Sequence, residues 1–367
     1  MAVAAVTDRV GLAWRPELAH GLYQHLDDLD VLEVLADDWL ADDRRPVTDL
    51  QAWAKEIPLH LHGTRLGLAS AEPLDDRLLD RWASLLNTVR PAAWSEHLAL
   101  TGAGGIRLPH FLAPPRTPGG VAAIAANLAQ VRRVVGSVPL LENPASLVDP
   151  PASSLDEAAW LGAIATHGHL LLDLHNLYAN AHNFPGDPLT TVRELLPRLP
   201  ISRVTAVHLA GGRAWRGRWL DDHRHAVPDA VWTLLEDLAA LGPGPLEVII
   251  EWDGDYPAMD HLLGEVAETR RRLAAGRRQP RPMLATVPPL LTERDDRTAI
   301  LHRFLVSVVA DSKTLVAFQA DPLGVATTAG IPQDLVAQVA KADLQGLEIA
   351  AASLTAKAKQ RHGSMPR

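Results

Sequence analysis

Eight short apolar runs occur in the first 275 residues of this chain, and longer amphipathic stretches separate them. Each run is short enough for a β-strand, and the stretches between them place apolar residues at helical spacing. This alternation is typical of repeated βα units, and eight such units close into a barrel of about 250 residues. The expected fold is therefore an α/β (β/α)8 TIM barrel with strands at residues 10–14, 31–36, 57–63, 93–100, 138–143, 169–176, 204–210 and 246–253.

Charged or imidazole side chains lie at the carboxyl ends of these runs, although buried parallel strands ordinarily consist of Val, Ile and Leu. These side chains are Arg15, Glu33, His62, His97, Glu142, Asp173, His208 and Glu251. Barrel enzymes keep their chemistry at this face, and ionisable groups that meet there must compensate one another or bind cations. The pattern predicts a metal site at the barrel mouth.

Two further clusters add ligand types. Asn176 follows Asp173 by three residues, and the segment 219–228 contains Asp221, Asp222, His223 and His225. In total these groups exceed the needs of one ion, because a mononuclear catalytic site takes about three protein ligands. The chain has no cysteine, so a metal must be held by nitrogen and oxygen atoms. Such a ligand set suits iron, manganese or zinc.

Simpler roles remain open for several of these residues. Arg15 and Glu33 could pair with each other at the barrel mouth. His60 and His62 share one strand, and we expect His62 to face the lumen and His60 to point outward toward a helix. The other histidines show no constellation and are expected at the surface or in packing: His20, His25, His110, His167, His261, His302 and His362.

The charge balance also limits the function. The chain of 367 residues carries 35 Lys and Arg against 44 Asp and Glu, for a formal net charge of −9. A protein that coats nucleic acid needs a basic face, so this balance disfavours that class. No apolar run reaches the ~18 residues of a membrane span, and the N-terminus lacks the apolar core of a secretory signal. We therefore expect a cytoplasmic protein with no membrane or nucleic-acid partner.

Composition changes toward the C-terminus, because only five of the basic residues are lysine and four of these lie after residue 312. Prolines and charges in residues 276–291 are typical of a linker. We place a catalytic barrel domain at 1–277, a linker at 278–291 and a helical C-terminal domain at 292–367. A capping box beginning at Thr292 and apolar residues at helical spacing predict helices over 300–309, 331–340 and 347–360.

Several segments occur in order and resemble the successive motifs of one family. They are IPLHLHG, WSEHLAL, LLENPASLV, LLLDLHNLYANAHN, VHLAGG, DDHRHAVPDAVW and IIEWDGDYP, preceded by GLAWRPEL and VLEVLADDW. These motifs are similar to those of the DUF692 family, the multinuclear non-heme iron oxidative enzymes (MNIO), which includes methanobactin-type peptide-modifying oxidases. The resemblance runs from about residue 10 to residue 275.

The resemblance implies a TIM barrel that holds two or three iron ions in a mixed-valent Fe(II)/Fe(III) centre, with O2 as co-substrate. By motif, the implied metal ligands are His62, His97, Glu142, Asp173, Asn176, His208, Asp221, His223 and Glu251. The resemblance groups them into a first site of His62, His97 and Glu142, a second of Glu142, Asp173, His208 and Glu251, and a third of Asn176, Asp221 and His223.

This sequence departs from the family pattern at positions that concern the substrate rather than the ligands. The family often has Asn at the position of His175, Arg at that of Trp252, and a Glu-Asn pair near residues 37–38. Asp253, two residues beyond the last ligand, is a candidate proton acceptor. Substrate-binding roles are expected for His175, His225 and Trp252.

The resemblance also implies a function, because relatives oxidatively modify ribosomally made (RiPP) precursor peptides, commonly at cysteine, and usually work with a partner protein. The expected function is iron- and O2-dependent modification of a precursor peptide. Residues 292–367 would present the peptide in cis or contact a partner, or would only cap the barrel. The alternative functions are a divalent-metal isomerase or phosphodiester hydrolase of the xylose-isomerase-like type, and a non-catalytic metal-binding scaffold.

Overall fold

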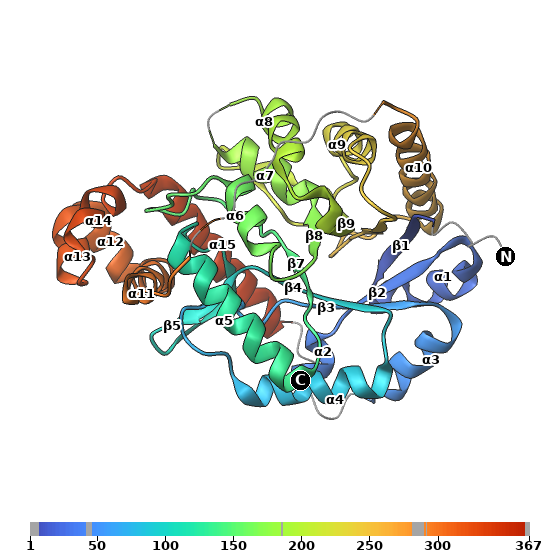
Figure 1. The fold of residues 1–367 in the computed structure, drawn as a ribbon, viewed down its shortest axis with the longest axis horizontal. Helices are drawn as coiled ribbons and strands as arrows, with labels where there is room; N and C mark the ends of the chain where they lie inside the picture. The colour runs from blue at the N-terminus through green and yellow to red at the C-terminus, as the bar shows by residue number, and fades with distance from the viewer. Residues whose placement is uncertain (1–6, 42–45, 185, 281–289, 291, 364–367) are drawn as a thin grey trace.

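The computed structural model describes residues 7–41, 46–184, 186–280, 290 and 292–363. Eight parallel strands form a closed barrel in chain order, in which the last strand pairs with the first (Figure 1). This confirms the predicted (β/α)8 barrel. The strands are β1 (Arg9–Trp14), β2 (Val31–Leu35), β3 (Leu59–Gly63), β4 (Ala93–His97), β7 (Leu140–Glu142), β8 (Leu170–Asp173), β9 (Val204–Leu209) and β12 (Glu247–Ile250).

Helices surround the barrel strands, and two hairpins extend from loops near its mouth. The hairpins are β5 (Leu100–Ala103) with β6 (Ile106–Leu112), and β10 (Arg213–Trp215) with β11 (Arg218–Leu220). The helices are α1 (Ala19–Gln24), α2 (Asp37–Ala41), α3 (Thr48–Glu56), α4 (Asp76–Val89), α5 (Pro118–Val135), α6 (Glu157–Ile164), α7 (Leu174–Asn183), α8 (Pro188–Leu195), α9 (Asp229–Ala240) and α10 (Met259–Arg277). Short 3-10 helices are η1 (Pro16–Leu18), η2 (Leu26–Asp28), η3 (Leu196–Arg198) and η4 (Ile201–Arg203).

The barrel forms because buried apolar strands pack against amphipathic helices. In α4, for example, Asp75 caps the first turn, and Leu79, Trp82 and Leu85 face the core. Strands β1 and β2 approach very closely at Gly11, where a Cβ atom would lie 1.9 Å from the carbonyl oxygen of Val31. Only glycine permits this approach, which helps to set the barrel register.

Several predicted strand details differ from the structure. The predicted strand 169–176 ends at Asp173, because helix α7 begins at Leu174. The run 93–100 is one strand only as far as His97, because the chain then bends and Leu100 begins the hairpin strand β5. Glu33 lies in the middle of β2 rather than at its carboxyl end. The buried carboxylate of Glu33 therefore enters the barrel interior below the mouth, where it contacts histidines.

Residues after the barrel form a helical unit, as predicted. It comprises α11 (Asp296–Ala310), α12 (Ser312–Ala320), α13 (Pro322–Thr328), α14 (Gln333–Val339) and α15 (Leu344–Gly363). Its core contains Phe304 and Phe318, and it also packs against Val148 of the barrel loop after β7. In Figure 1 the helices α11–α14 group at one side of the barrel. Helix α15 contacts the hairpin strand β6.

The three predicted helices correspond to α11, α14 and α15, whereas α12 and α13 were not expected. Both helices are short, and each starts at an Asp cap, Asp311 and Asp321. The predicted capping box is wrong, because the cap of α11 is Asp295, whose carboxylate accepts from the backbone N–H of Thr298. Within the predicted linker, residues 281–289 and 291 lie outside the described residues, and the domain division stays a prediction.

Among the described residues, no helix is long and apolar enough to cross a membrane.

His302 on α11 is expected to make stability depend on pH. Its side chain is buried, and its Nδ1 accepts a hydrogen bond from the backbone N–H of Ala71, 3.2 Å away, in the barrel unit. Burial lowers the pKa of His302 from 6.5 to about 4. The unfolded chain takes up this proton near its ordinary pKa, so stability is present above that value and is lost as the pH falls toward 4, by up to about 3 kcal/mol.

The measurement is the unfolding free energy of the wild type and of His302→Asn, which retains an acceptor, at about pH 7 and about pH 5. The wild type should lose more stability than the variant on acidification. An equal loss in both proteins would contradict this role of His302.

Candidate metal centre

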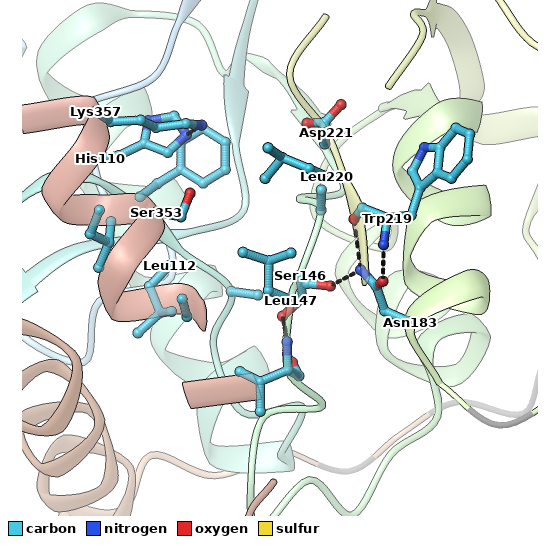
Figure 2. Close-up of a pocket in the computed structure, with 16 residues that line it drawn as sticks. His110, Leu112, Ser146, Leu147, Asn183, Trp219, Leu220, Asp221, Ser353 and Lys357 are labelled. Atoms are coloured by element: carbon cyan, nitrogen blue, oxygen red, sulfur yellow. Dashed lines mark hydrogen bonds between the residues drawn. The ribbon is translucent and has the colours of Figure 1, made fainter. Parts of the chain in front are cut away.

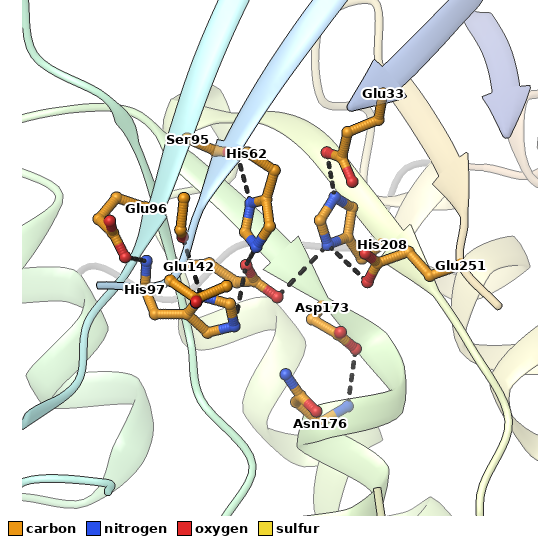
Figure 3. Close-up of polar contacts among 12 residues, drawn as sticks. Glu33, His62, Ser95, Glu96, His97, Glu142, Asp173, Asn176, His208 and Glu251 are labelled. Carbon is orange, nitrogen blue, oxygen red and sulfur yellow. Dashed lines mark hydrogen bonds and ion pairs between the residues drawn. The ribbon is translucent and has the colours of Figure 1, made fainter. Parts of the chain in front are cut away.

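Three ligand-type side chains from neighbouring strands meet on one side of the barrel mouth (Figure 3). His62 lies near the end of β3, His97 at the end of β4 and Glu142 at the end of β7. The register places His97 directly opposite Glu142. Glu142 Oε2 lies 3.5 Å from His62 Nε2 and 3.4 Å from His97 Nε2, and all three side chains are buried. Their ligand atoms are close enough to share one cation.

A second group shares Glu142 with the first. Its other members are Asp173 at the end of β8, His208 on β9 and Glu251 just after β12. Strand register aligns Asp173 with His208. The Nδ1 atom of His208 lies 3.3 Å from Glu142 Oε1 and 3.1 Å from Glu251 Oε2. The two oxygens of Glu142 therefore face different groups, an arrangement suited to bridging two ions.

A third group lies in the loop after β11. Asp221 Oδ1 is 2.7 Å from His223 Nε2 and 2.8 Å from His175 Nδ1, and these three residues form the third set of close ligand atoms. His223 has a left-handed backbone with φ of 51°. Such a conformation costs a non-glycine residue about 1 kcal/mol or more and is often found at functional sites. His175, which was expected to contact substrate, lies beside Asp221 and His223, the two residues that the family resemblance groups with Asn176.

Buried polar atoms without a hydrogen-bond partner provide a test of whether these residues fit metal ions. Within the described residues, such atoms include one or more from each group: Glu142 Oε2, Asp173 Oδ2, Asn176 Oδ1, His208 Nδ1, and both ring nitrogens of His223. A buried polar atom without a partner costs free energy, and a bound cation would satisfy these atoms together. The nitrogen and oxygen donors therefore fit transition-metal ions.

The start of α7 explains why Asp173 and Asn176 present one oxygen each. Asp173 caps this helix, with Oδ1 accepting from the backbone N–H of Asn176 at 2.7 Å, which leaves Oδ2 available. The side-chain nitrogen of Asn176 donates to the carbonyl oxygen of Asn143 at 3.0 Å, which fixes the amide with Oδ1 free. Asn143 in turn forms two hydrogen bonds with the backbone of Asp173.

Ser95 orients the ring of His62 by contacting Nδ1, the ring nitrogen that does not face Glu142. Its hydroxyl lies 2.8 Å from His62 Nδ1 and 2.9 Å from His60 Nε2. The other nitrogen of His60 lies 2.6 Å from the Glu247 carboxylate. The prediction that His60 points outward is wrong, because residues two apart on a strand project to the same face. Both histidines lie inside the barrel, with His60 supporting His62.

Glu33 supports His208 in the same way, since its Oε2 lies 2.8 Å from His208 Nε2 and leaves Nδ1 directed at the second group. Supporting contacts of this kind fix the orientation of metal-binding imidazoles. Arg15 and Glu33 do not form the ion pair that the sequence left open. Arg15 instead donates to Asp253 through Nε at 3.0 Å and through Nη2 at 2.5 Å. Asp253 Oδ2 lies 3.5 Å from His223 Nδ1.

The electrostatics of the buried groups are mixed. Burial, with Glu142 and Asp221 nearby, raises the pKa of Asp173 well above its usual value. Burial opposes charging of His208, but the surrounding carboxylates, chiefly Glu251, raise its pKa well above the ordinary value. Burial also disfavours the charged form of Glu251, yet the attraction of His208 holds its pKa well below the usual range. The centre therefore concentrates negative charge that cations would neutralise.

The residues expected to contact substrate lie in different surroundings. Trp252 is buried, and its indole N–H donates to Glu265 of α10 at 2.9 Å, so its side chain does not line the cavity at the barrel mouth. His175 is also buried, and its Nε2 accepts from the Trp219 indole at 2.9 Å. His225 is partly exposed and lies 3.1 Å from Asp222.

Three supporting contacts were not predicted from the sequence. They are made by Ser95, Asn143 and Glu33. Ser95 precedes His97 by two positions, so the period of a strand already placed both side chains on one face. That signal was available. The two backbone hydrogen bonds of Asn143 depend on the pairing of β7 with β8, which the chain alone does not specify.

The chain matches the family model described as RiPP precursor modification enzyme MbnB/TglH/ChrH over residues 9–274. The chain belongs to this family. It is also 35% identical over 275 residues to a UPF0276 protein of Caulobacter vibrioides, an alignment that covers 74% of this chain and 96% of that protein. A UPF0276 protein of Acaryochloris marina is 31% identical over 271 residues, which cover 73% of this chain and 96% of that protein.

A solved structure supports the fold of this member of the MbnB/TglH/ChrH family. The chain is similar to a xylose isomerase-like TIM barrel/4-hydroxyphenylpyruvate dioxygenase fusion protein, with 12% identity and a TM-score of 0.50. The similarity covers 77% of this chain and 47% of the fusion protein. At this identity the similarity concerns the fold alone. The family model ends before the C-terminal helical unit begins.

Removing the Ser95 hydroxyl is expected to weaken metal binding in this MbnB/TglH/ChrH family member. Ser95→Ala would leave the ring nitrogens of His60 and His62 without their shared partner. Loss of such a supporting contact typically reduces metal affinity about 10- to 100-fold. Titration of metal-free protein would measure this change. Ser146→Ala is the control, because this serine is also buried and its hydroxyl contacts the backbone of Val148 in its own loop. Equal affinity in both variants would contradict the role of Ser95.

Proposed function

We propose that this protein is a multinuclear iron enzyme that uses O2 to modify a ribosomally made precursor peptide, at cysteine. The observation that carries the proposal is the position of Glu142, whose two oxygens face two neighbouring ligand groups. Membership of a family of RiPP precursor modification enzymes supports the peptide as substrate. The absence of cysteine from the chain means that sulfur at the centre would come from the substrate.

The proposed ligands fall into three sites. His62, His97 and Glu142 would hold the first ion, and Glu142, Asp173, His208 and Glu251 the second. Asp221 and His223 would hold a third with Asn176, whose free Oδ1 is buried, and His175 would orient Asp221 through its 2.8 Å contact. Bound iron would supply one-electron oxidation and reaction with O2 at positions that the protein leaves open.

Asp253 is the proposed proton acceptor. Its carboxylate lines the cavity above the centre, and Arg15 holds one of its oxygens. Its other oxygen lies toward His223. This geometry places an oriented base at the edge of the centre, where it can take a proton from a substrate bound in the cavity.

The C-terminal helical domain, residues 292–367, is proposed to take part in substrate recognition in cis. Helix α15 contributes Ser353, Ala356 and Lys357 to the lining of the cavity that also contains His62 and Glu251. A helical unit that only capped the outside of the barrel would not reach this cavity. The barrel domain, residues 1–277, would supply the chemistry, and residues 278–291 would link the two.

The test is co-expression with cysteine-containing precursor peptides encoded beside the gene, followed by mass spectrometry of the peptides. We expect a mass change that requires both iron and O2 and that is absent with Glu142→Gln. Peptides of unchanged mass with iron-loaded protein in air would reject the proposed function.

A further inference from the structure

Three candidate ligand histidines in the barrel must keep the ring nitrogen that faces the centre free of a proton. His62, His97 and His208 each direct one ring nitrogen toward the carboxylate of Glu142. A neutral imidazole carries its proton on one nitrogen, and a metal ion binds through the other. The partner of the nitrogen that faces away from the centre therefore decides whether the ring is ready to bind.

Two of these rings have partners that can only accept a hydrogen bond. His97 Nδ1 lies 3.2 Å from the carbonyl oxygen of Gly63. His208 Nε2 lies 2.8 Å from the carboxylate of Glu33. A carbonyl or carboxylate oxygen holds the proton on the nitrogen that contacts it. Both rings therefore leave the nitrogen on the side of Glu142 free.

His62 differs from these two, because its partner is a hydroxyl group. His62 Nδ1 lies 2.8 Å from Ser95 Oγ, and the same hydroxyl lies 2.9 Å from His60 Nε2. A serine hydroxyl has one proton to donate and can also accept. If Ser95 donates to His60, it accepts from His62 Nδ1 and leaves His62 Nε2 free. The proton of His60 therefore decides the proton of His62.

Glu247 fixes the proton of His60 from the opposite end of the barrel. Its Oε1 lies 2.6 Å from His60 Nδ1, and Arg9 donates to its Oε2. Burial opposes the charged form of Glu247, yet the hydrogen bond with His60 and the charge of Arg9 hold its pKa below the ordinary value. A carboxylate can only accept, so His60 carries its proton on Nδ1 and offers Nε2 to Ser95 as an acceptor.

A second carboxylate lies near His60 but is engaged by another ring. Glu33 Oε2 is 4.0 Å from His60 Nε2, too far for a hydrogen bond, and it accepts from His208 instead. If residue 247 no longer accepted, the charge of Glu33 would favour a proton on His60 Nε2. Ser95 would then accept from His60 and donate to its other partner, so the hydrogen bonds would reverse.

The residues of this hydrogen-bond relay lie away from the two cavities beside the centre. Helix α15 forms one wall of the larger cavity, of about 640 Å³. The smaller pocket, of about 70 Å³, lies between α15 and the loop after β7 (Figure 2). Neither cavity is lined by His60, Ser95 or Glu247. Glu247 begins β12, four residues or about 13 Å along the strand before Glu251 at the mouth. A change at Glu247 therefore leaves the substrate space intact.

We infer that Glu247 is a positioning residue that sets the tautomer of His62 through His60 and Ser95. The hydrogen bonds run in one direction from His62 to Glu247, which keeps His62 Nε2 free for binding. This inference rests on the proposed function for the metal ion that His62 would hold. It gives the end of the barrel opposite the mouth a part in preparing the first metal site.

Glu247→Gln tests the direction of the relay without changing the size of the side chain. Glutamine has one acceptor oxygen, but both Arg9 and His60 donate to this position. When Arg9 holds that oxygen, the amide NH2 faces His60 Nδ1, which must then accept. Every hydrogen bond as far as His62 is reversed as a result.

NMR of metal-free protein with 15N-labelled histidine shows which ring nitrogen of His62 carries the proton. The His62 signals are identified by their loss in His62→Gln. The wild type should carry this proton on Nδ1, and Glu247→Gln should carry it on Nε2. Glu265→Gln is the matched control, because Glu265 is equally buried but lies on α10, outside the barrel. The control should have the tautomer of the wild type.

Zinc titration in competition with a chelator, followed at the His62 ring, measures the consequence for binding. Glu247→Gln should lower the zinc affinity about 10-fold, as is typical for loss of a supporting contact. In a Ser95→Ala background the same change should cause no further loss, because the relay is already interrupted. A merely structural effect of residue 247 would lower the affinity equally in both backgrounds.

A proton on His62 Nε2 in the wild type would overturn the inference. The wild-type tautomer in Glu247→Gln would also overturn it, as would an equal loss of zinc affinity with and without Ser95. A His62 ring with its proton on Nδ1 that does not respond to zinc would leave the inference standing and reject the proposed first metal site. The experiment uses no iron, O2 or peptide, so failure of the peptide test would not change its result.

Discussion

Replacement of Glu142 by glutamine is expected to reduce metal binding at both groups in the barrel and to abolish peptide modification. The carboxylate is buried between His62, His97 and His208, and each of its oxygens faces a different group. Glutamine has the same shape, but it carries no charge and has only one acceptor oxygen. Because even a supporting contact contributes up to about 100-fold to metal affinity, loss of a shared ligand should weaken binding by at least ~100-fold.

Metal analysis of Glu142→Gln after dialysis measures this effect. Glu96→Gln is a matched control, because Glu96 is equally buried on the neighbouring strand and belongs to none of the ligand groups. Its carboxylate accepts only backbone N–H hydrogen bonds among the described residues, from Arg65, Leu66 and His97. The control should retain its metal. Full metal content in Glu142→Gln, or equal loss in both variants, would contradict the bridging role.

Truncation of Phe318 to alanine is expected to loosen the helical unit without emptying the metal centre. Phe318 is fully buried in α12 and contacts Phe304 edge to face, with ring centroids 5.3 Å apart. Removing a buried Phe side chain costs about 3–5 kcal/mol. Since Leu347 and Leu354 of α15 belong to the same core, the wall of the cavity should become mobile. Peptide retention should then decrease while metal content remains.

Hydrogen exchange of α15 and metal analysis measure these two effects separately. Val316→Ala on the same helix is the control, because this side chain is exposed and its loss should change stability by less than about 0.5 kcal/mol. Unchanged exchange of α15 in Phe318→Ala would show that the helical core does not hold the wall. If Phe318→Ala lost its metal as well as the protection of α15 from exchange, the metal centre would depend on the helical unit, and the account would be contradicted.

The barrel and the ligand set could be predicted because both depend on local signals. Each strand is a short apolar run, and parallel strands bring their carboxyl ends to one face, so His62, His97 and Glu142 were expected to converge. The strand period, applied correctly, also places His60 inside the barrel. Identifying Ser95 as a supporting residue required only the same rule.

Other features depend on contacts between distant segments, which local patterns do not specify. Trp252 follows the last strand, but its indole turns outward because Glu265 on α10 accepts its N–H. The wall formed by Lys357 depends on how α15 docks on β6, since the helical periodicity of α15 does not indicate its partner. His175 lies beside Asp221 and His223 because the loop after β11 folds back toward α7.

Metal analysis combined with Mössbauer spectroscopy of anaerobically purified protein tests the central claim most directly. The account predicts two or three iron ions per chain, with spectra of interacting Fe(II) and Fe(III) sites that disappear in Glu142→Gln. Stoichiometric zinc, with no dependence of peptide modification on iron, would contradict it.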